Sequence, residues 1–176
     1  CVRLVGSEMC IRDSRWIENR LNKYLNNILK TDDDYVIASD TDSVYLTLDK
    51  LVTKTIKSDN ALSKTINFLD KVASESIEPY ITKSYDELKQ YTNAFANKMF
   101  MKREVIADKG IWVAKKRYIL NVWNSEGVSY KEPKLKMMGI EAVKSSTPAI
   151  CRQKIKDALE LIMTSDEKEL NKFVIN

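Results

Sequence analysis

Two short hydrophobic runs flank a polar segment in the stretch Tyr35-Val36-Ile37-Ala38-Ser39-Asp40-Thr41-Asp42-Ser43-Val44-Tyr45-Leu46-Thr47-Leu48. Residues 35–38 and 44–48 are rich in β-branched and aromatic side chains, which favour strands. The segment between them is polar and too short for anything but a turn. We therefore predict a β-hairpin with the carboxylates of Asp40 and Asp42 at its tip.

Helices are predicted on both sides of this hairpin. From Trp16 to Leu29, apolar residues recur at spacings of one, three and four, the stripe of an amphipathic helix that packs on a sheet. Residues 59–91 carry two more such stripes, and Pro79 divides them because proline is favoured near a helix start.

A β-rich block is predicted from about Met99 to Ile140. Its turn signals are residues 108–110 (Asp-Lys-Gly) and 125–127 (Ser-Glu-Gly), which separate strands such as the one expected over 111–122.

The last part of the chain has helix-start signals. Thr147 is expected to be an N-cap with Pro148 at the first helical position, opening a helix to about Met163. Thr164 and Glu167 have the spacing of a capping box for a further helix.

The composition excludes several classes of chemistry. The 176 residues contain no histidine, which removes mechanisms built on Ser-His or Cys-His pairs and on His-ligated zinc. No run reaches the roughly 18 to 20 apolar residues of a membrane span, and no signal peptide is recognisable, so we expect a cytoplasmic protein. Cys1, Cys10 and Cys151 lack metal or redox spacing, and Cys151 is expected to be a small buried thiol.

The acidic tip suits a divalent cation. Asp40 and Asp42 are two residues apart, so in an extended backbone their side chains project on the same side. Magnesium prefers carboxylate oxygens and shares substrate phosphates, which makes the pair half of a site for phosphoryl or nucleotidyl transfer. The alternative is a solvated turn, because Asp and Ser side chains hydrogen-bond their own backbone there.

Positive charge is concentrated in residues 109–144. This block has three acids (Glu126, Glu132, Glu141) against eight basic residues: Lys109, Lys115, Lys116, Arg117, Lys131, Lys134, Lys136 and Lys144. Its net charge is +5, whereas the chain as a whole has +4. Such a block is typical of a surface that neutralises nucleic-acid phosphates, and the alternative is an ordinary solvated face.

Two motifs extend this interpretation through a resemblance. The string Asp-Thr-Asp-Ser at 40–43 resembles motif C of the family B DNA polymerases, although Ala38 and Ser39 stand where that family usually has Tyr and Gly. Lys-Lys-Arg-Tyr at 115–118 resembles the motif by which the family holds the primer–template duplex. The match runs from about Trp16 to Ser165 and looks closest to the tailed-bacteriophage replicative branch.

The resemblance implies an α+β fold with an antiparallel palm sheet and packed helices, followed by the first helices of an α-helical thumb. Residues 15–140 would be the C-terminal half of the palm, and 141–176 the truncated start of the thumb. Residues 1–14 share no periodicity with the rest and resemble a translated sequencing-adapter string. We therefore expect residues 1–14 to be non-native. Because the chain starts at Cys1 rather than Met and stops part-way through a helical pattern, we also expect it to be a fragment.

The resemblance also implies catalytic roles. Asp42 would be a direct ligand of two catalytic magnesium ions, shared with an aspartate upstream of this chain, and Asp40 would sit beside them. Glu104 matches an acidic residue near the catalytic centre. A paired surface acid beside Lys102 and Arg103 is the alternative for Glu104.

The basic motif would hold DNA. Lys116 and Lys144 would reach the minor groove near the primer terminus, and Lys115, Arg117 and Tyr118 would complete the duplex contact.

The activity implied is two-metal addition of deoxynucleotides to a primer 3′ end in phage DNA replication, in the host cytoplasm. Its partners would be primer–template DNA, deoxynucleoside triphosphates and, through a C-terminal tail outside this chain, a sliding clamp. The isolated chain would be inactive. The main alternative is a non-catalytic nucleic-acid-binding module. A metal-dependent glycosyltransferase would fit Asp40-x-Asp42 and leave the basic block unexplained.

Overall fold

The computed structural model describes residues 2–40, 43–56, 62–165 and 167–175. The chain forms two compact units, residues 1–103 and 104–176, and each combines helices with antiparallel strands. The α+β fold class is therefore confirmed. The expected boundary between palm and thumb at residue 140 lies inside the second unit and stays a prediction.

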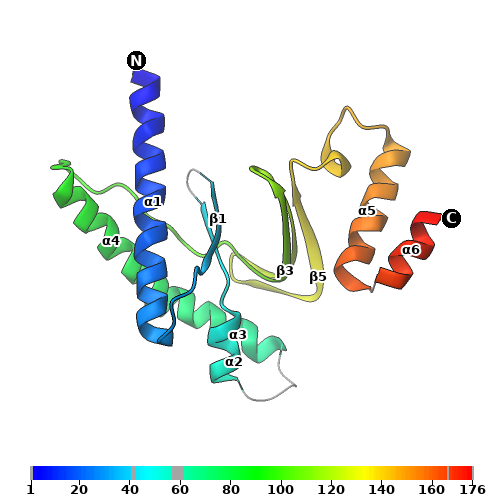
Figure 1. The fold of residues 1–176 in the computed structure, drawn as a ribbon, viewed down its shortest axis with the longest axis horizontal. Coiled ribbons are helices and arrows are strands. Elements are labelled where there is room, and N and C mark those ends of the chain that lie inside the picture. Colours follow the sequence, from blue (N-terminus) through cyan, green and yellow to red (C-terminus); the bar gives the residue numbers. More distant parts are fainter. Residues whose placement is uncertain (1, 41–42, 57–61, 166, 176) are drawn as a thin grey trace. The chain divides into compact units, whose positions relative to one another are not determined.

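The first unit is built from a two-stranded antiparallel sheet and packed helices (Figure 1). Its elements are α1 (Val2–Leu29), β1 (Val36–Asp40), β2 (Ser43–Leu46), α2 (Asp49–Thr55), α3 (Leu62–Val72), the π-helical turn Ala73–Ile77 and α4 (Glu78–Tyr91). The hairpin and the helix over 16–29 are thus confirmed. Helix α1 begins at Val2. The expectation that residues 1–14 are non-native stays a prediction, because a helical conformation does not test it.

The core of this unit lies between α1 and α4. Ile17 and Leu21 of α1 are fully buried against Ile81 and Leu88 of α4. The hairpin joins the same cluster through partly buried apolar side chains, which are Val36, Val44 and Leu46. The apolar stripe of α1 therefore packs on both a helix and the hairpin.

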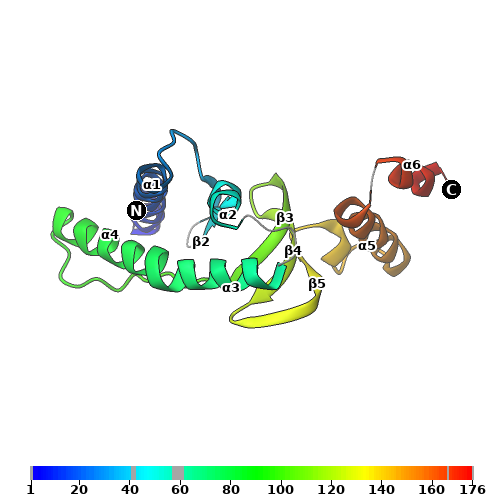
Figure 2. The ribbon, with the colours of Figure 1, turned by 90° about the horizontal axis from the view of Figure 1, so that it is seen from below.

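The expected division at Pro79 is present in a milder form. Proline lacks the N–H of an α-helical hydrogen bond and its ring crowds the carbonyl four residues back. Pro79 lies at the start of α4, directly after the π-helical turn, and the chain stays helical throughout. Figure 2 shows α3 and α4 following one another along a common line.

The second unit is a three-stranded antiparallel sheet with helices after it. Strands β3 (Val105–Ala114), β4 (Arg117–Ser125) and β5 (Val128–Met138) lie in that order and precede a 3₁₀ turn (Glu141–Val143), α5 (Ala149–Thr164) and α6 (Glu167–Ile175). Ile119, Leu135 and Met137 of the sheet pack with Ile155 and Met163 of α5. One face of the sheet is therefore covered by α5.

One of the two expected turns in this unit is wrong. The turn at 125–127 is confirmed, but residues 108–110 lie inside β3, where the pairing with β4 shifts register. Asp108 Oδ1 accepts a hydrogen bond from Asn121 Nδ2 at 2.8 Å, which ties this irregularity to β4. The expected strand over 111–122 is instead interrupted after Ala114, so the reversal falls on Lys115 and Lys116.

The predicted caps near the end of the chain also need correction. The N-cap of α5 is Pro148 and not Thr147, so the helix starts one residue later than expected. The Thr164 hydroxyl donates to the Glu160 carbonyl at 2.7 Å inside α5, so it does not form a capping box with Glu167. Cys151 is exposed on the first turns of α5, which contradicts the expected buried thiol.

Candidate functional site

The acidic hairpin begins the candidate site. Asp40 is the last residue of β1 and pairs with Ser43, the first residue of β2. The Ser43 hydroxyl donates to the Asp40 carbonyl oxygen at 3.2 Å, which closes the turn. Thr41 and Asp42 lie outside the described residues, so the shared direction of the two carboxylates stays a prediction.

Helix α1 holds the base of this hairpin through two asparagines one turn apart. Asn22 Oδ1 accepts hydrogen bonds from the backbone N–H groups of Tyr35 and Val36, at 2.9 and 3.1 Å. Asn26 makes two hydrogen bonds with the backbone of Asp33, both at 2.9 Å. Because these bonds fix the first residue of β1 and the residues before it, they set where the strand starts and hence where the hairpin tip lies.

The described part of the acidic hairpin supplies one carboxylate that suits a magnesium ion. Asp40 is partly buried, and its carboxylate is the kind of ligand that a hard cation prefers. Among the residues that the structure describes, no three acidic, cysteine or histidine side chains gather closely enough to hold a metal. The described residues therefore fit magnesium through one carboxylate, and further ligands must come from elsewhere.

The basic motif lies on a second hairpin, in the other unit. Ala114 and Arg117 pair across β3 and β4, so Lys115 and Lys116 form a two-residue turn between them. Lys116 has a φ of 61°, a left-handed conformation that is uncommon for residues other than glycine. Both lysines are exposed, and neither has an acidic partner among the described residues. Their charges are therefore directed to solvent.

A single carboxylate joins the two other predicted basic contacts. Arg117 Nη2 donates to both carboxylate oxygens of Glu141, at 2.8 and 2.6 Å, and Lys144 Nζ donates to Glu141 Oε1 at 3.0 Å. The Lys144 ammonium, followed by the residue's own backbone N–H, lowers the pKa of the Glu141 carboxyl, and the Arg117 charge acts in the same direction. Glu141 is therefore held in its ionised form.

Tyr118 is placed differently from its neighbours. Its side chain is 6% exposed, and its ring centroid lies 6.5 Å from that of Trp112 on β3. This burial favours a packing role at the base of the lysine turn. Direct contact between Tyr118 and DNA stays a prediction.

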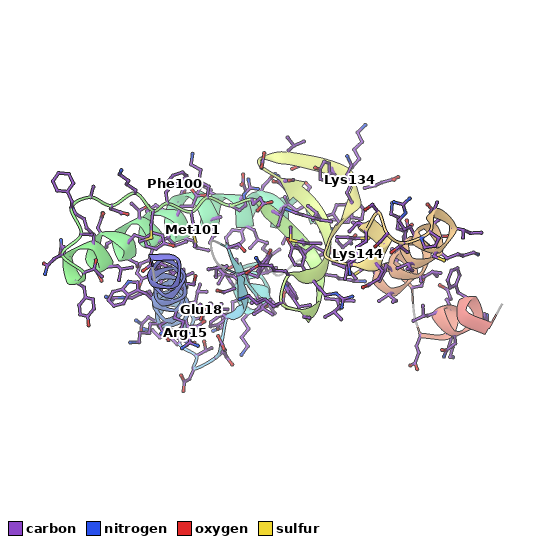
Figure 3. All side chains as sticks on the ribbon, turned by 90° about the horizontal axis from the view of Figure 1, so that it is seen from above. Arg15, Glu18, Phe100, Met101, Lys134 and Lys144 are labelled. Carbon is purple, nitrogen blue, oxygen red and sulfur yellow. The ribbon has the colours of Figure 1, made fainter. Side chains whose placement is uncertain are left out.

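Three other cations of the basic block have contacts inside the second unit. Lys109 Nζ donates to the Met163 carbonyl at 2.7 Å, near the C-terminal end of α5. Lys134, labelled on β5 in Figure 3, lies 4.3 Å from the Tyr130 ring centroid. Lys136 forms an ion pair with Glu104. Three of the eight basic residues of the block therefore make contacts inside the second unit.

Glu104 is an exposed acid whose ion-pair partner is Lys136. The adjacent Arg103 instead pairs with Asp70 on α3. The expected paired surface acid thus exists, with a partner 32 residues away in the sequence. A role for Glu104 near a metal stays a prediction.

Comparison with known proteins assigns the family. The chain is 41% identical over 163 residues to the DNA-directed DNA polymerase of Escherichia phage RB69, a match that covers 87% of the chain. It is 35% identical over 175 residues to the enzyme of the same name from Enterobacteria phage T4, covering 92% of the chain. The chain belongs to the phage family B DNA polymerases. No family model matches it.

This phage polymerase chain spans 18% of the RB69 protein and 19% of the T4 protein. Among its described residues, no helix is long and apolar enough to cross a membrane.

Sequence reasoning missed two features of this polymerase chain. One is the turn at Lys115 and Lys116, which lacks the Gly or Asn that usually marks a two-residue hairpin. The other is the position of Glu141 between two basic side chains, which the composition of the basic block does not reveal. Its spacing of three from Lys144 was the available signal, because such residues are neighbours on a helical turn.

Proposed function

We propose that this chain is part of a DNA-directed DNA polymerase that adds deoxynucleotides to a primer 3′ end during phage DNA replication. The observation that carries the proposal is the match over 87% of the chain to a protein of that name. Two hairpins support it, since one ends at Asp40 and the other presents Lys115 and Lys116 to solvent.

The acidic hairpin would carry the chemistry. Asp42 and Asp40 would hold two magnesium ions together with an aspartate outside this chain, and Glu104 would contribute nearby. When bound, such ions lower the pKa of the 3′ hydroxyl and neutralise charge on the triphosphate. The catalytic contribution of the protein would be positioning and charge placement, which need no histidine.

The basic hairpin would hold the duplex. Lys115 and Lys116 are exposed on a tight turn, a position from which a side chain can reach a phosphate or groove edge. Lys144 lies after the 3₁₀ turn and is labelled in Figure 3. We propose that these lysines contact primer–template DNA, with Arg117 and Tyr118 supporting the turn.

The remaining partners follow from the same proposal. Deoxynucleoside triphosphates would be the substrates, and the host cytoplasm would be the compartment. A sliding clamp would bind a tail outside this chain.

A primer-extension experiment tests the proposal. The 176-residue chain is assayed beside a chimaera in which it replaces the aligned segment of the RB69 protein. We expect magnesium-dependent extension by the chimaera and none by the chain alone, because part of the metal site lies outside the chain. Extension by the chain alone would contradict the second expectation. A chimaera that folds and binds primer–template but never extends it would instead favour the non-catalytic binding module.

Replacement of Lys116 by alanine tests the duplex contact. The affinity of the chain for a labelled primer–template duplex should fall, and the slope of log K against log salt should decrease by about 0.9, the value for one lost phosphate contact. Fluorescence anisotropy between low and moderate salt measures both.

The matched control is Lys131→Ala, which removes one exposed lysine from β5. It should change the slope much less. Equal effects of the two substitutions would mean that the duplex is attracted by the whole basic block and has no defined contact at the turn.

A further inference from the structure

Glu141 lies where three segments of the second unit meet. Its carboxylate accepts hydrogen bonds from Arg117 at the start of β4 and from Lys144 beyond the 3₁₀ turn. Arg117 Nε also donates to the Gly139 carbonyl at 3.2 Å, at the end of β5. One acid and one guanidinium thus connect the lysine turn, the end of β5 and the Lys144 segment.

These contacts limit what Arg117 can offer to DNA. Its Nε and Nη2 donors are hydrogen-bonded to Gly139 and Glu141, which are groups of the protein itself. The Arg117 side chain is 39% exposed, and its charge is opposed by an ionised carboxylate. The two lysines of the turn are exposed and lack such an opponent among the described residues. Arg117 is therefore better placed to support the turn than to contact a phosphate.

We propose that Glu141 is a positioning residue for duplex binding. Through Arg117 it holds the Lys115-Lys116 turn, and through its own ion pair it holds Lys144, so that the two lysine segments form one binding surface. Arg117 acts through Glu141 and does not contact the DNA. The inference rests on the proposed function, since it assumes that this surface binds primer–template.

The two possible roles of Glu141, lowering the local positive charge and positioning the lysines, predict opposite changes in duplex affinity when its charge is removed. If Glu141 only opposed the field of its neighbours, then Glu141→Gln would raise the local positive charge by one and strengthen binding to a polyanion. If Glu141 positions the lysines, the same substitution frees Arg117 and Lys144 from a common partner and weakens binding. The sign of the change distinguishes the two roles.

Duplex affinity of the 176-residue chain provides the test, with Glu141→Gln, Glu141→Asp and the matched control Glu132→Gln. Glu132 is an exposed acid on β5, so its substitution makes the same change in net charge outside the lysine turn. We expect Glu141→Gln to bind roughly three- to tenfold more weakly, the size that a small network of partly exposed ion pairs supports. Glu132→Gln should bind equally well or slightly more tightly.

Glu141→Asp keeps the charge and shortens the side chain by one methylene. It should also weaken binding, because the shorter carboxylate cannot reach Arg117 and Lys144 together. This variant keeps the test valid if Glu141→Gln unfolds the chain, which thermal unfolding reports. Unchanged or tighter binding by a folded Glu141 variant would overturn the inference.

A double-mutant cycle with Arg117→Lys tests the indirect role of Arg117. Lysine keeps the charge but cannot reproduce the guanidinium contacts. If Arg117 acts through Glu141, Arg117→Lys weakens binding in the wild-type chain and adds little to Glu141→Gln. Additive losses would show that Arg117 contacts DNA directly and would overturn that part of the inference.

Failure of the positioning role can be distinguished from failure of the proposed function. If Lys116→Ala weakens duplex binding and the Glu141 variants do not, the DNA surface stands and the positioning role is wrong. If the wild-type chain does not bind duplex, the proposed DNA surface and the positioning role are both wrong.

Discussion

Replacement of Asp42 by alanine should abolish primer extension by the chimaera that carries this chain, lowering the rate by at least about a thousandfold. The reason is that several kcal/mol of charge stabilisation in the transition state would depend on metal ions that this carboxylate holds. Duplex affinity should stay within about twofold, because the proposed phosphate contacts are made by lysines elsewhere in the chain. Single-turnover extension and anisotropy measure the two effects separately.

Asp32→Ala is the matched control for this substitution. Asp32 is an exposed aspartate before β1, so its removal costs the same charge in the same unit. It should leave extension nearly unchanged. Loss of duplex binding along with extension in Asp42→Ala would mean that Asp42 maintains the fold and is no metal ligand.

Replacement of Gly139 by alanine should destabilise the second unit by about 2–4 kcal/mol, the sum of a left-handed backbone penalty and a steric contact. Gly139 has a φ of 65° and follows β5. A Cβ atom there would lie 2.2 Å from the Lys116 carbonyl oxygen, so the backbone of the lysine turn would have to move. Duplex affinity should fall together with stability, since the displaced turn carries the proposed DNA contacts.

Urea unfolding of a Trp16→Phe background measures this effect, because the remaining tryptophans, Trp112 and Trp123, both lie in the second unit. Gly127→Ala is the matched control. Gly127 also has a positive φ, of 88°, but an added Cβ would meet nothing within 4 Å. It should cost about 1 kcal/mol, the backbone penalty alone. Equal losses at the two glycines would show that the close approach of Gly139 to Lys116 does not exist in solution.

The acidic hairpin and its flanking helix could be predicted from sequence because their signals are local. β-Branched runs on either side of a short polar segment specify a hairpin, and the stripe that includes Ile17 and Leu21 specifies a buried helix face. Helix α2 was missed. At seven residues it is shorter than the span over which helical periodicity can be counted.

The second sheet was harder to predict because tertiary contacts override its turn signals. Asp-Lys-Gly at 108–110 has the composition of a turn, yet Asp108 accepts a hydrogen bond from Asn121 of β4. The backbone of Gly110 also lies so close to the Trp112 ring that a Cβ atom there would clash with it. The real turn uses two lysines, which have no turn preference of their own. Pairing with β4 decides the position of the reversal.

Some parts of the candidate site can likewise be predicted from local sequence, and others depend on tertiary contacts. The motifs at 40–43 and 115–118 were visible as contiguous strings, so a resemblance could be drawn from them. The contact between Arg117 and Glu141 joins residues 24 apart in the sequence, so no local sequence pattern predicts it. The burial of Tyr118 likewise depends on a partner strand, since it pairs with Trp112 on one side and Met138 on the other.

The basic sheet is unevenly charged along its strands. The end with the lysine turn has one acid, Glu141, and four basic residues, Lys115, Lys116, Arg117 and Lys144, which leaves a charge of +3. Near the opposite end, Lys131 and Lys134 are balanced by Glu126 and Glu132. The sheet therefore has an electric dipole along the strand direction. Such a dipole exerts a torque on an approaching polyanion, so a nucleic acid would be oriented toward the turn before any contact forms.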